Sequence, residues 1–150
     1  MTRDSTSMVY TSTTRQVYED EVITIYLDLS LSLLRLVWKQ QPSSMQYRQG
    51  YRRAIVLALE HKTRYWLTDS RRILYLYQAD QHWMYAKMRP LLKGGKLQRM
   101  TIVLQPETLI MTDQGPIHDR STASFRGKKL FYLDFFLDVE SALSWLQSPD

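Results

Sequence analysis

Apolar and polar residues alternate near the start of the chain in the way that β-strands require. Two such runs, 22–31 and 33–38, adjoin each other and predict an antiparallel β-hairpin. The residues before them, 1–16, are mostly Ser, Thr and isolated charges, so we expect a flexible N-terminal tail. The folded domain is therefore expected over residues 17–150.

A change to three- and four-residue spacing marks the first helix. Ser43 and Ser44 follow a proline and are suited to capping a helix N-terminus. Apolar residues then recur on one face until about His61, namely Tyr47, Tyr51, Ala54, Ile55 and Ala58. Gly50 weakens such a helix by about 1 kcal/mol relative to alanine, which suggests close packing against the sheet.

Strands and helices alternate over the next part of the chain. The aromatic run 65–67 predicts a buried strand whose carboxyl end is marked by Asp69. Asp80 is suited to be the N-cap of a second long helix, with Pro90 near its end. Between them, residues 73–77 fit a strand or a short helical turn equally well.

The last third of the chain predicts two more strands and two helices. The β-branched run 100–104 predicts a buried strand, and a short helix is expected to begin at Pro106. Residues 130–136 predict the last strand, and Asp138 is expected to cap a final helix. The segment 113–129 between them combines glycine, proline and clustered positive charge, so we expect it to be mobile.

This order of elements predicts an α/β fold with one domain. The sheet is expected to be mixed, with the antiparallel N-terminal hairpin beside parallel strands that helices connect by right-handed crossovers. In open α/β sheets, ligands and partners usually meet the crevice beyond the carboxyl ends of the strands. The residues expected at that edge are Asp69, Ser70, Arg71 and Arg72.

Composition supports a globular protein and excludes some chemistry. The chain has 150 residues, of which 44% are hydrophobic and 23% charged, within the range of domains with a real core. It has no cysteine, which excludes disulfides and thiolate sites. Because there is no signal-peptide pattern and no apolar run of roughly 18 residues, we expect a soluble, cytoplasmic protein.

The net charge of +5 would favour acidic partners. Acidic residues interleave with the basic ones, however, and no nucleic-acid motif accompanies them. We therefore expect scattered charge and no nucleic-acid binding.

The sequence contains no recognisable catalytic or metal-binding pattern. Its histidines, His61, His82 and His118, lie on different predicted elements without the spacing of metal ligands. There is no Gly-x-Ser-x-Gly elbow, and Gly94-Gly95 lacks the spacing of a phosphate-binding loop. We therefore expect no catalytic residues, no metal and no cofactor.

Several landmarks occur in an order that resembles the SpoIIAA-like family of STAS-type domains. They are Val17-Tyr18-Glu19-Asp20, Trp38, Tyr51-Arg52, Trp66-Leu67-Thr68-Asp69-Ser70-Arg71, the Asp80 to Trp83 pair, Pro90, and Ala142-Leu143-Ser144-Trp145-Leu146. The resemblance implies a STAS-like α/β fold related to CRAL-TRIO lipid-binding domains, a bacterial cytoplasmic setting and a mostly unassigned function.

The best understood relatives in this resemblance, anti-sigma-factor antagonists, bind a kinase. They are switched by phosphorylation of a serine in an Asp-Ser-Ser-Gly motif that opens a helix. The corresponding position here reads Asp80-Gln81-His82-Trp83, without the acceptor serine or the glycine. The phosphorylation switch is therefore not carried over to this chain.

These observations favour a non-enzymatic regulatory or protein-interaction module. We expect a protein partner, which could be a second copy of the chain. The candidate binding residues are Asp69, Ser70, Arg71, Arg72, Asp80 and His82. The alternative is a carrier or sensor of a lipid or small apolar ligand held between helices and sheet, and a nucleic-acid-binding module ranks below both.

Overall fold

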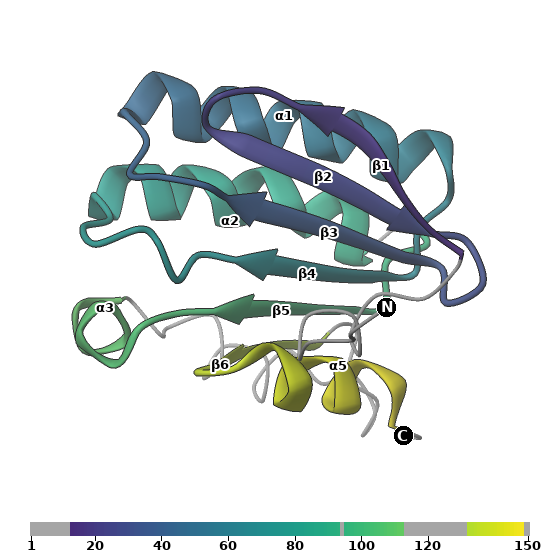
Figure 1. The fold of residues 1–150 in the computed structure, drawn as a ribbon. Helices are drawn as coiled ribbons and strands as arrows, with labels where there is room; N and C mark the ends of the chain where they lie inside the picture. The colour runs from purple at the N-terminus through teal and green to yellow at the C-terminus, as the bar shows by residue number, and fades with distance from the viewer. Residues whose placement is uncertain (1–12, 94, 113–131, 149–150) are drawn as a thin grey trace, which may run out of the picture.

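The computed structural model describes residues 13–93, 95–112 and 132–148, which form one six-stranded sheet covered by helices (Figure 1). In chain order the elements are β1 (Thr14–Glu19), β2 (Ile23–Asp28), β3 (Leu33–Trp38), α1 (Ser44–Glu60), β4 (Tyr65–Asp69), α2 (Gln78–Lys93), β5 (Arg99–Val103), α3 (Pro106–Met111), β6 (Tyr132–Phe136) and α5 (Val139–Gln147). Among the described residues, no helix combines the length and the hydropathy needed to span a membrane.

The strands lie in the sheet in their chain order, from β1 to β6. β1, β2 and β3 are antiparallel neighbours, whereas β3, β4, β5 and β6 run parallel. This arrangement confirms the predicted α/β class and its mixed sheet. The parallel strands all end at the same edge, which we call the carboxyl edge.

The N-terminal boundary of the fold differs from the prediction. Residues 14–16, assigned to a flexible tail, are strand, and Thr14 pairs with Asp28 of β2. β1 is an edge strand with half of its side chains exposed, and a bulge between Gln16 and Tyr18 shifts its register. Because of both features, β1 lacks the regular apolar alternation that would indicate a strand in the sequence. Residues 1–12 lie outside the described part of the chain.

Helices cover the two faces of the sheet unequally. Figure 1 shows α1 and α2 side by side along one face, with α5 on the other. The larger core lies under α1 and α2 and contains Trp38, Trp66, Met84 and Met100, all at most 1% exposed. A smaller core under α5 includes Leu67, Val103, Ala142 and Leu146.

Local signals at the ends of α1 and α5 are confirmed. Ser43 is the N-cap of α1, and its hydroxyl accepts a hydrogen bond from the backbone N–H of Gln46 while the Gln46 side chain accepts from the N–H of Ser43. Asp138 is the N-cap of α5, where its carboxylate accepts hydrogen bonds from the backbone N–H of Ser141 at 2.7 Å and from the Ser141 hydroxyl at 2.9 Å.

The expected close approach at Gly50 is also confirmed. A Cβ atom at this position would lie 2.7 Å from Cη2 of Trp38. Trp38 is buried at the end of β3, so the glycine allows α1 to pack directly on the sheet.

Two predictions around α2 need correction or completion. Asp80 is not the N-cap, because α2 begins two residues earlier, at Gln78, and Asp80 lies inside the first turn. Residues 73–77, which fitted a strand or a helical turn, form neither element. The segment 113–129, expected to be mobile, lies outside the described residues.

Candidate functional site

Asp69 and Arg71 form a bidentate ion pair at the end of β4. Nε of Arg71 donates to Oδ1 of Asp69 at 2.9 Å, and Nη2 donates to Oδ2 at 2.7 Å. The backbone N–H of Arg71 also donates to Oδ1, at 3.2 Å. Both oxygens of this buried carboxylate are therefore committed to shaping the chain immediately after the strand.

Asp69, Arg71 and Arg72 line a hollow of about 580 Å³ at the carboxyl edge. The lining residues come from β3, β4, the start of α3 and the connections that follow β4, β5 and β6: Val37, Trp38, Asp69, Arg71, Arg72, Leu104, Gln105, Pro106 and Leu137. Its size is in the range of sites that accept a small molecule or a partner's side chain. The structure thus brings together three of the four residues expected at this edge.

Ser70, the fourth, does not line the hollow. It is 4% exposed, and its backbone N–H donates to the carbonyl of Val103 at 2.8 Å. This bond extends the pairing of β4 with β5 beyond the last residue of β4. Ser70 therefore holds the edge together from inside rather than presenting a hydroxyl to a partner.

The irregular connection 70–77 is fixed by side chains from both neighbouring elements. Oε1 of Gln41 accepts from the backbone N–H of Leu74 at 2.7 Å and of Tyr75 at 3.1 Å, while its Nε2 donates to the Tyr75 carbonyl at 2.7 Å. On the other side, Thr108 donates to the carbonyl of Ile73 at 3.1 Å. Gln105 donates to the carbonyl of Arg71. The connection is thus bound to the residues after β3 and to α3.

Large apolar side chains project from this edge. Leu74, Tyr75 and Tyr77 are 63%, 52% and 54% exposed, and the two tyrosine rings meet edge to face with centroids 4.7 Å apart. Further exposed apolar residues lie on α1, on α3 and just after β6. We call the whole set the carboxyl-edge surface: Met45, Arg71, Arg72, Leu74, Tyr75, Tyr77, Ile110, Met111 and Leu137.

The apolar part of this surface was missed in the sequence. The sequence predicted a strand or a helical turn at residues 73–77, because an apolar run normally indicates a buried element. The available signal for exposure was that residues 73–77, which follow a predicted strand, show neither the helical nor the strand period. The glutamines that hold the connection, Gln41 and Gln105, carried no signal, because their partners are distant in the chain.

Asp80 and His82 lie apart from the hollow. Asp80 is 2% exposed between α1 and α2, where it accepts hydrogen bonds from Oγ of Ser44 at 2.6 Å and Nε of Arg48 at 2.9 Å. The guanidinium of Arg48 also lies over the ring of Trp83, 5.3 Å from its centroid. Asp80 therefore joins two helices, while His82 is exposed on α2.

The charge of Arg71 reaches beyond its partner Asp69. Hydrogen bonds from the backbone N–H and the hydroxyl of Ser141 lower the pKa of Asp138, and the positive charge of Arg71 lowers it further. Arg71 thus links the end of β4 electrostatically to the start of α5. Within the described ranges, no cluster of three or more His, Asp or Glu residues is arranged to hold a metal ion.

Comparison with known proteins gives one fold-level likeness. The chain is similar to the crystal structure of an uncharacterized protein from the DUF3478 family with a SpoIIAA-like fold from Shewanella loihica PV-4. The two share 18% sequence identity over 87% of this chain and 98% of that chain, with a TM-score of 0.45. No protein-family model and no curated protein matches the chain. The likeness concerns the fold alone.

Proposed function

We propose that this chain is a non-enzymatic interaction module that binds a protein partner through the carboxyl-edge surface. The observation that carries the proposal is the composition of that surface. Its side chains are Tyr, Met, Arg and large aliphatic residues, and the first three types are enriched at protein interfaces. Seven of its nine members are exposed apolar residues contributed by four separate segments of the chain.

The rigidity of the edge supports binding by a preformed surface. Gln41, Gln105 and Thr108 together fix the backbone of the 70–77 connection. A connection that is already ordered loses little conformational entropy when a partner docks. The neighbouring hollow, with the exposed side chain of Leu137 in its lining, offers a place for one anchoring side chain of that partner.

The ion pair at the edge favours a binding role over catalysis. A general base needs an oxygen atom that can accept a proton from a substrate. In Asp69 both carboxylate oxygens accept hydrogen bonds from Arg71, and the half-exposed guanidinium covers them. Arg71 and Arg72 then serve as polar contacts at the rim of an apolar surface.

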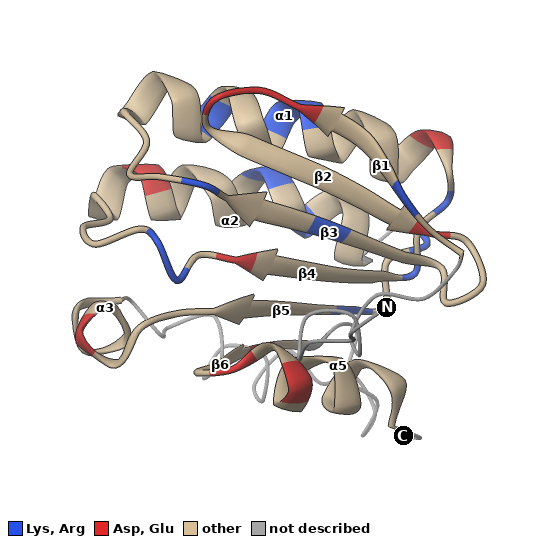
Figure 2. Cartoon of the chain, viewed as in Figure 1, with Lys and Arg blue, Asp and Glu red and all other residues tan. Residues whose placement is uncertain are grey.

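The distribution of charge supports a protein partner rather than nucleic acid. Over the described part of the chain, Figure 2 shows basic and acidic segments interleaved along the elements. Several cations are already paired: Lys39 with Glu19 at 3.0 Å, Arg48 with Asp80 at 2.9 Å and Arg71 with Asp69 at 2.7 Å. Such pairs leave less positive charge for a row of phosphates.

The packing between helices and sheet argues against the alternative of a ligand carrier. Four aromatic rings lie in contact there in the order Trp38, Tyr47, Tyr51 and Trp66, with successive centroids 5.4, 5.0 and 6.1 Å apart. The first and last pairs are stacked, and the middle pair is tilted. All four side chains are at most 3% exposed. They fill the space between α1 and strands β3 and β4, so this part of the core cannot enclose an apolar ligand.

The test compares two double variants, each of which replaces two exposed apolar side chains with Ser. One changes Leu74 and Tyr75 to Ser at the carboxyl edge, and its control changes Val56 and Leu59, which are 52% and 56% exposed on α1, to Ser. Each tagged protein captures partners from a lysate of the source organism, and light scattering measures its oligomeric state. We expect a protein, or a second copy of the chain, that binds the wild type and the control but not the edge variant.

Equal binding by the edge variant would contradict the proposed surface. Absence of any partner and a monomeric state at all concentrations would contradict the proposed function itself. Circular dichroism and urea unfolding establish that both variants are folded before either result is interpreted.

A further inference from the structure

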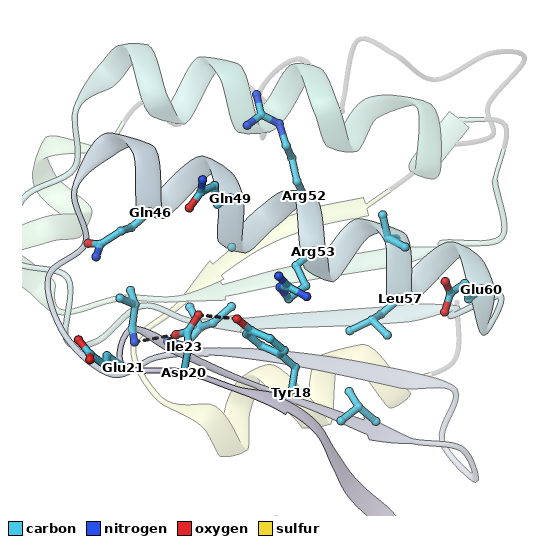
Figure 3. A pocket seen from close by; sticks show the side chains of 14 residues that line it. Tyr18, Asp20, Glu21, Ile23, Gln46, Gln49, Arg52, Arg53, Leu57 and Glu60 are labelled. Carbon is cyan, nitrogen blue, oxygen red and sulfur yellow. Dashed lines mark hydrogen bonds between the residues drawn. The ribbon is translucent and has the colours of Figure 1, made fainter.

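A second hollow lies on the opposite side of α1 from α2. It is a groove of about 880 Å³ between α1 and the residues from Val17 to Ile23, which include the β1–β2 turn (Figure 3). The lining residues of α1 extend from Gln46 to Glu60, which corresponds to roughly 21 Å of helix. The groove exists because β1 and β2 extend the sheet beyond the part that α1 packs against.

Arg53 occupies the middle of this groove. Its guanidinium lies over the ring of Tyr18, with Cζ 4.0 Å from the ring centroid. Figure 3 shows Arg53 directed toward Tyr18, whereas Arg52 points away from the groove. The guanidinium of Arg52 lies 5.0 Å from the centroid of the Trp83 ring on α2. Stacking on Tyr18 restricts the motion of the Arg53 side chain before any ligand binds.

The donors of Arg53 are not consumed by its neighbours. Within the described residues, Arg53 makes no hydrogen bond and no ion pair, although a guanidinium carries five N–H donors. The nearby carboxylate of Asp20 has other partners. It accepts from the hydroxyl of Tyr18 at 2.8 Å and from the backbone N–H groups of Val22 at 2.7 Å and Ile23 at 2.9 Å.

These contacts hold Asp20 in its charged form. Burial raises the pKa of Asp20, but the hydrogen bonds from Ile23, Tyr18 and Val22, with the charge of Arg53, outweigh burial and lower its pKa overall. Asp20 therefore shapes the β1–β2 turn and fixes the Tyr18 ring on which Arg53 rests. The planar face of Arg53 is used by Tyr18, while its N–H donors stay available at its edges.

The rest of the groove combines apolar surface with acidic ends. Val17, Val56 and Leu57 provide apolar walls. Glu21 and Glu60 line the two ends in Figure 3, on either side of the central Arg53. A ligand with one negative charge and an apolar body matches this pattern, whereas a ligand with several negative charges meets like charge at both ends.

We infer that the groove between α1 and the β1–β2 turn binds a small amphipathic organic monoanion, whose carboxylate is held by Arg53 and whose apolar part lies against Val17, Val56 and Leu57. The volume of the groove is within the range of small-molecule sites. This site is separate from the carboxyl-edge surface and does not depend on the proposed protein partner.

The test uses four probes with the same eight-carbon chain: octanoate, octanol, octyl phosphate and octylammonium. Binding to the wild-type protein is measured by calorimetry at neutral pH, below the concentrations at which the probes aggregate. We expect saturable binding of octanoate that is at least about tenfold tighter than that of octanol, because a charge-assisted hydrogen bond is worth more than a neutral one. Octyl phosphate and octylammonium are expected to bind more weakly than octanoate.

Three variants assign the binding to the groove. Arg53→Gln is expected to weaken octanoate binding about tenfold or more, and to leave octanol unchanged. Val56→Glu places a carboxylate on an exposed lining position and should weaken octanoate equally, without depending on the Tyr18 stack. The control, Arg89→Gln, removes an exposed arginine of α2 outside the groove and should bind octanoate as the wild type does.

Amide chemical shifts locate the bound probe. Changes on adding octanoate should be concentrated at Val17, Tyr18, Arg53 and Leu57. Equal affinity for octanoate and octanol, unchanged binding by Arg53→Gln, or shifts confined to the carboxyl edge would each overturn the inference. So would binding that does not saturate.

Discussion

Tyr51 illustrates how burial controls the chemistry of one residue. Its side chain is 1% exposed, and its hydroxyl donates to Oγ1 of Thr68 at 3.2 Å, the same atom that accepts from Nε1 of Trp66 at 2.7 Å. Burial raises the pKa of Tyr51 to about 12, although its hydrogen bonds with Thr68 and Tyr47 lower it. Burial likewise raises the pKa of Tyr47. Both phenols are therefore neutral in the folded protein well above the pH at which an exposed tyrosine ionises.

The shifted pKa of Tyr51 predicts a loss of stability at alkaline pH. The folded protein holds this proton more tightly than the unfolded chain, whose tyrosines ionise near pH 10, so the free energy of unfolding falls as pH rises from about 10 to about 12. Below pH 10 this residue contributes no pH dependence. Tyr51→Phe should reduce the alkaline slope and, by losing the bond to Thr68, cost about 1 kcal/mol at neutral pH.

Urea unfolding of wild type and Tyr51→Phe, measured across this pH interval, checks the prediction. The variant retains Tyr47, so its slope should be smaller but not zero. Identical slopes for the two proteins would show that Tyr51 does not titrate differently in the folded and unfolded states.

At the level of elements, the packing of α1 on β3 depends on Gly50. Alanine has a helix propensity about 1 kcal/mol better than glycine, which by itself would stabilise α1. Its Cβ, however, would lie 2.7 Å from Trp38, a buried ring stacked on Tyr47 at a centroid distance of 5.4 Å. Because this ring has little room to move, overpacking should outweigh propensity, and Gly50→Ala should destabilise the protein by about 1–3 kcal/mol.

The neighbouring exposed residue provides the control for this prediction. Gln49→Ala lies in the same helix without a core contact, so it should change the free energy of unfolding by less than about 0.5 kcal/mol. Chemical unfolding of both variants measures the difference. A Gly50→Ala protein as stable as the wild type would mean that α1 can move away from the sheet at little cost.

For the whole molecule, net charge is a poor guide to function. The formal charge is +5, yet each of the three arginines of α1 is directed to neighbours within the protein: Arg48 to Asp80 and Trp83, Arg52 to Trp83, and Arg53 to Tyr18. We therefore predict no binding of single- or double-stranded DNA or RNA at physiological salt. Weak binding at low salt should vanish steeply as salt is added, because it depends on released counterions.

Titration of labelled nucleic acids at low and physiological salt decides this prediction. Binding that survives physiological salt, and that is lost when Arg52 and Arg53 become Glu, would favour a nucleic-acid module over a protein-binding one. An unchanged affinity in that variant would instead place the contact elsewhere in the chain.

Much of the fold was readable from residues close together in the sequence. The apolar period located α1, and Asp80, Pro106 and Asp138 indicated the regions of α2, α3 and α5. Short β-branched or aromatic runs located the parallel strands. All these signals depend only on residues close together in the sequence. The general rule for open α/β sheets then placed Asp69, Arg71 and Arg72 at one edge. The start of β1 was not predicted, because an exposed, bulged edge strand has no regular apolar alternation.

The chemistry of the individual sites depended on contacts between residues far apart in the chain. Asp80 meets Arg48 across 32 positions, and Gln41 fixes Tyr75 across 34. The groove similarly combines Arg53 of α1 with Tyr18 of β1. Periodicity shows which face of an element is apolar, but it does not show which polar groups contact each other. Those contacts depend on strand order and on where each helix crosses the sheet. The pairing of Asp80, the exposure of Leu74 and Tyr75, and the free donors of Arg53 therefore became visible only once the elements were packed together.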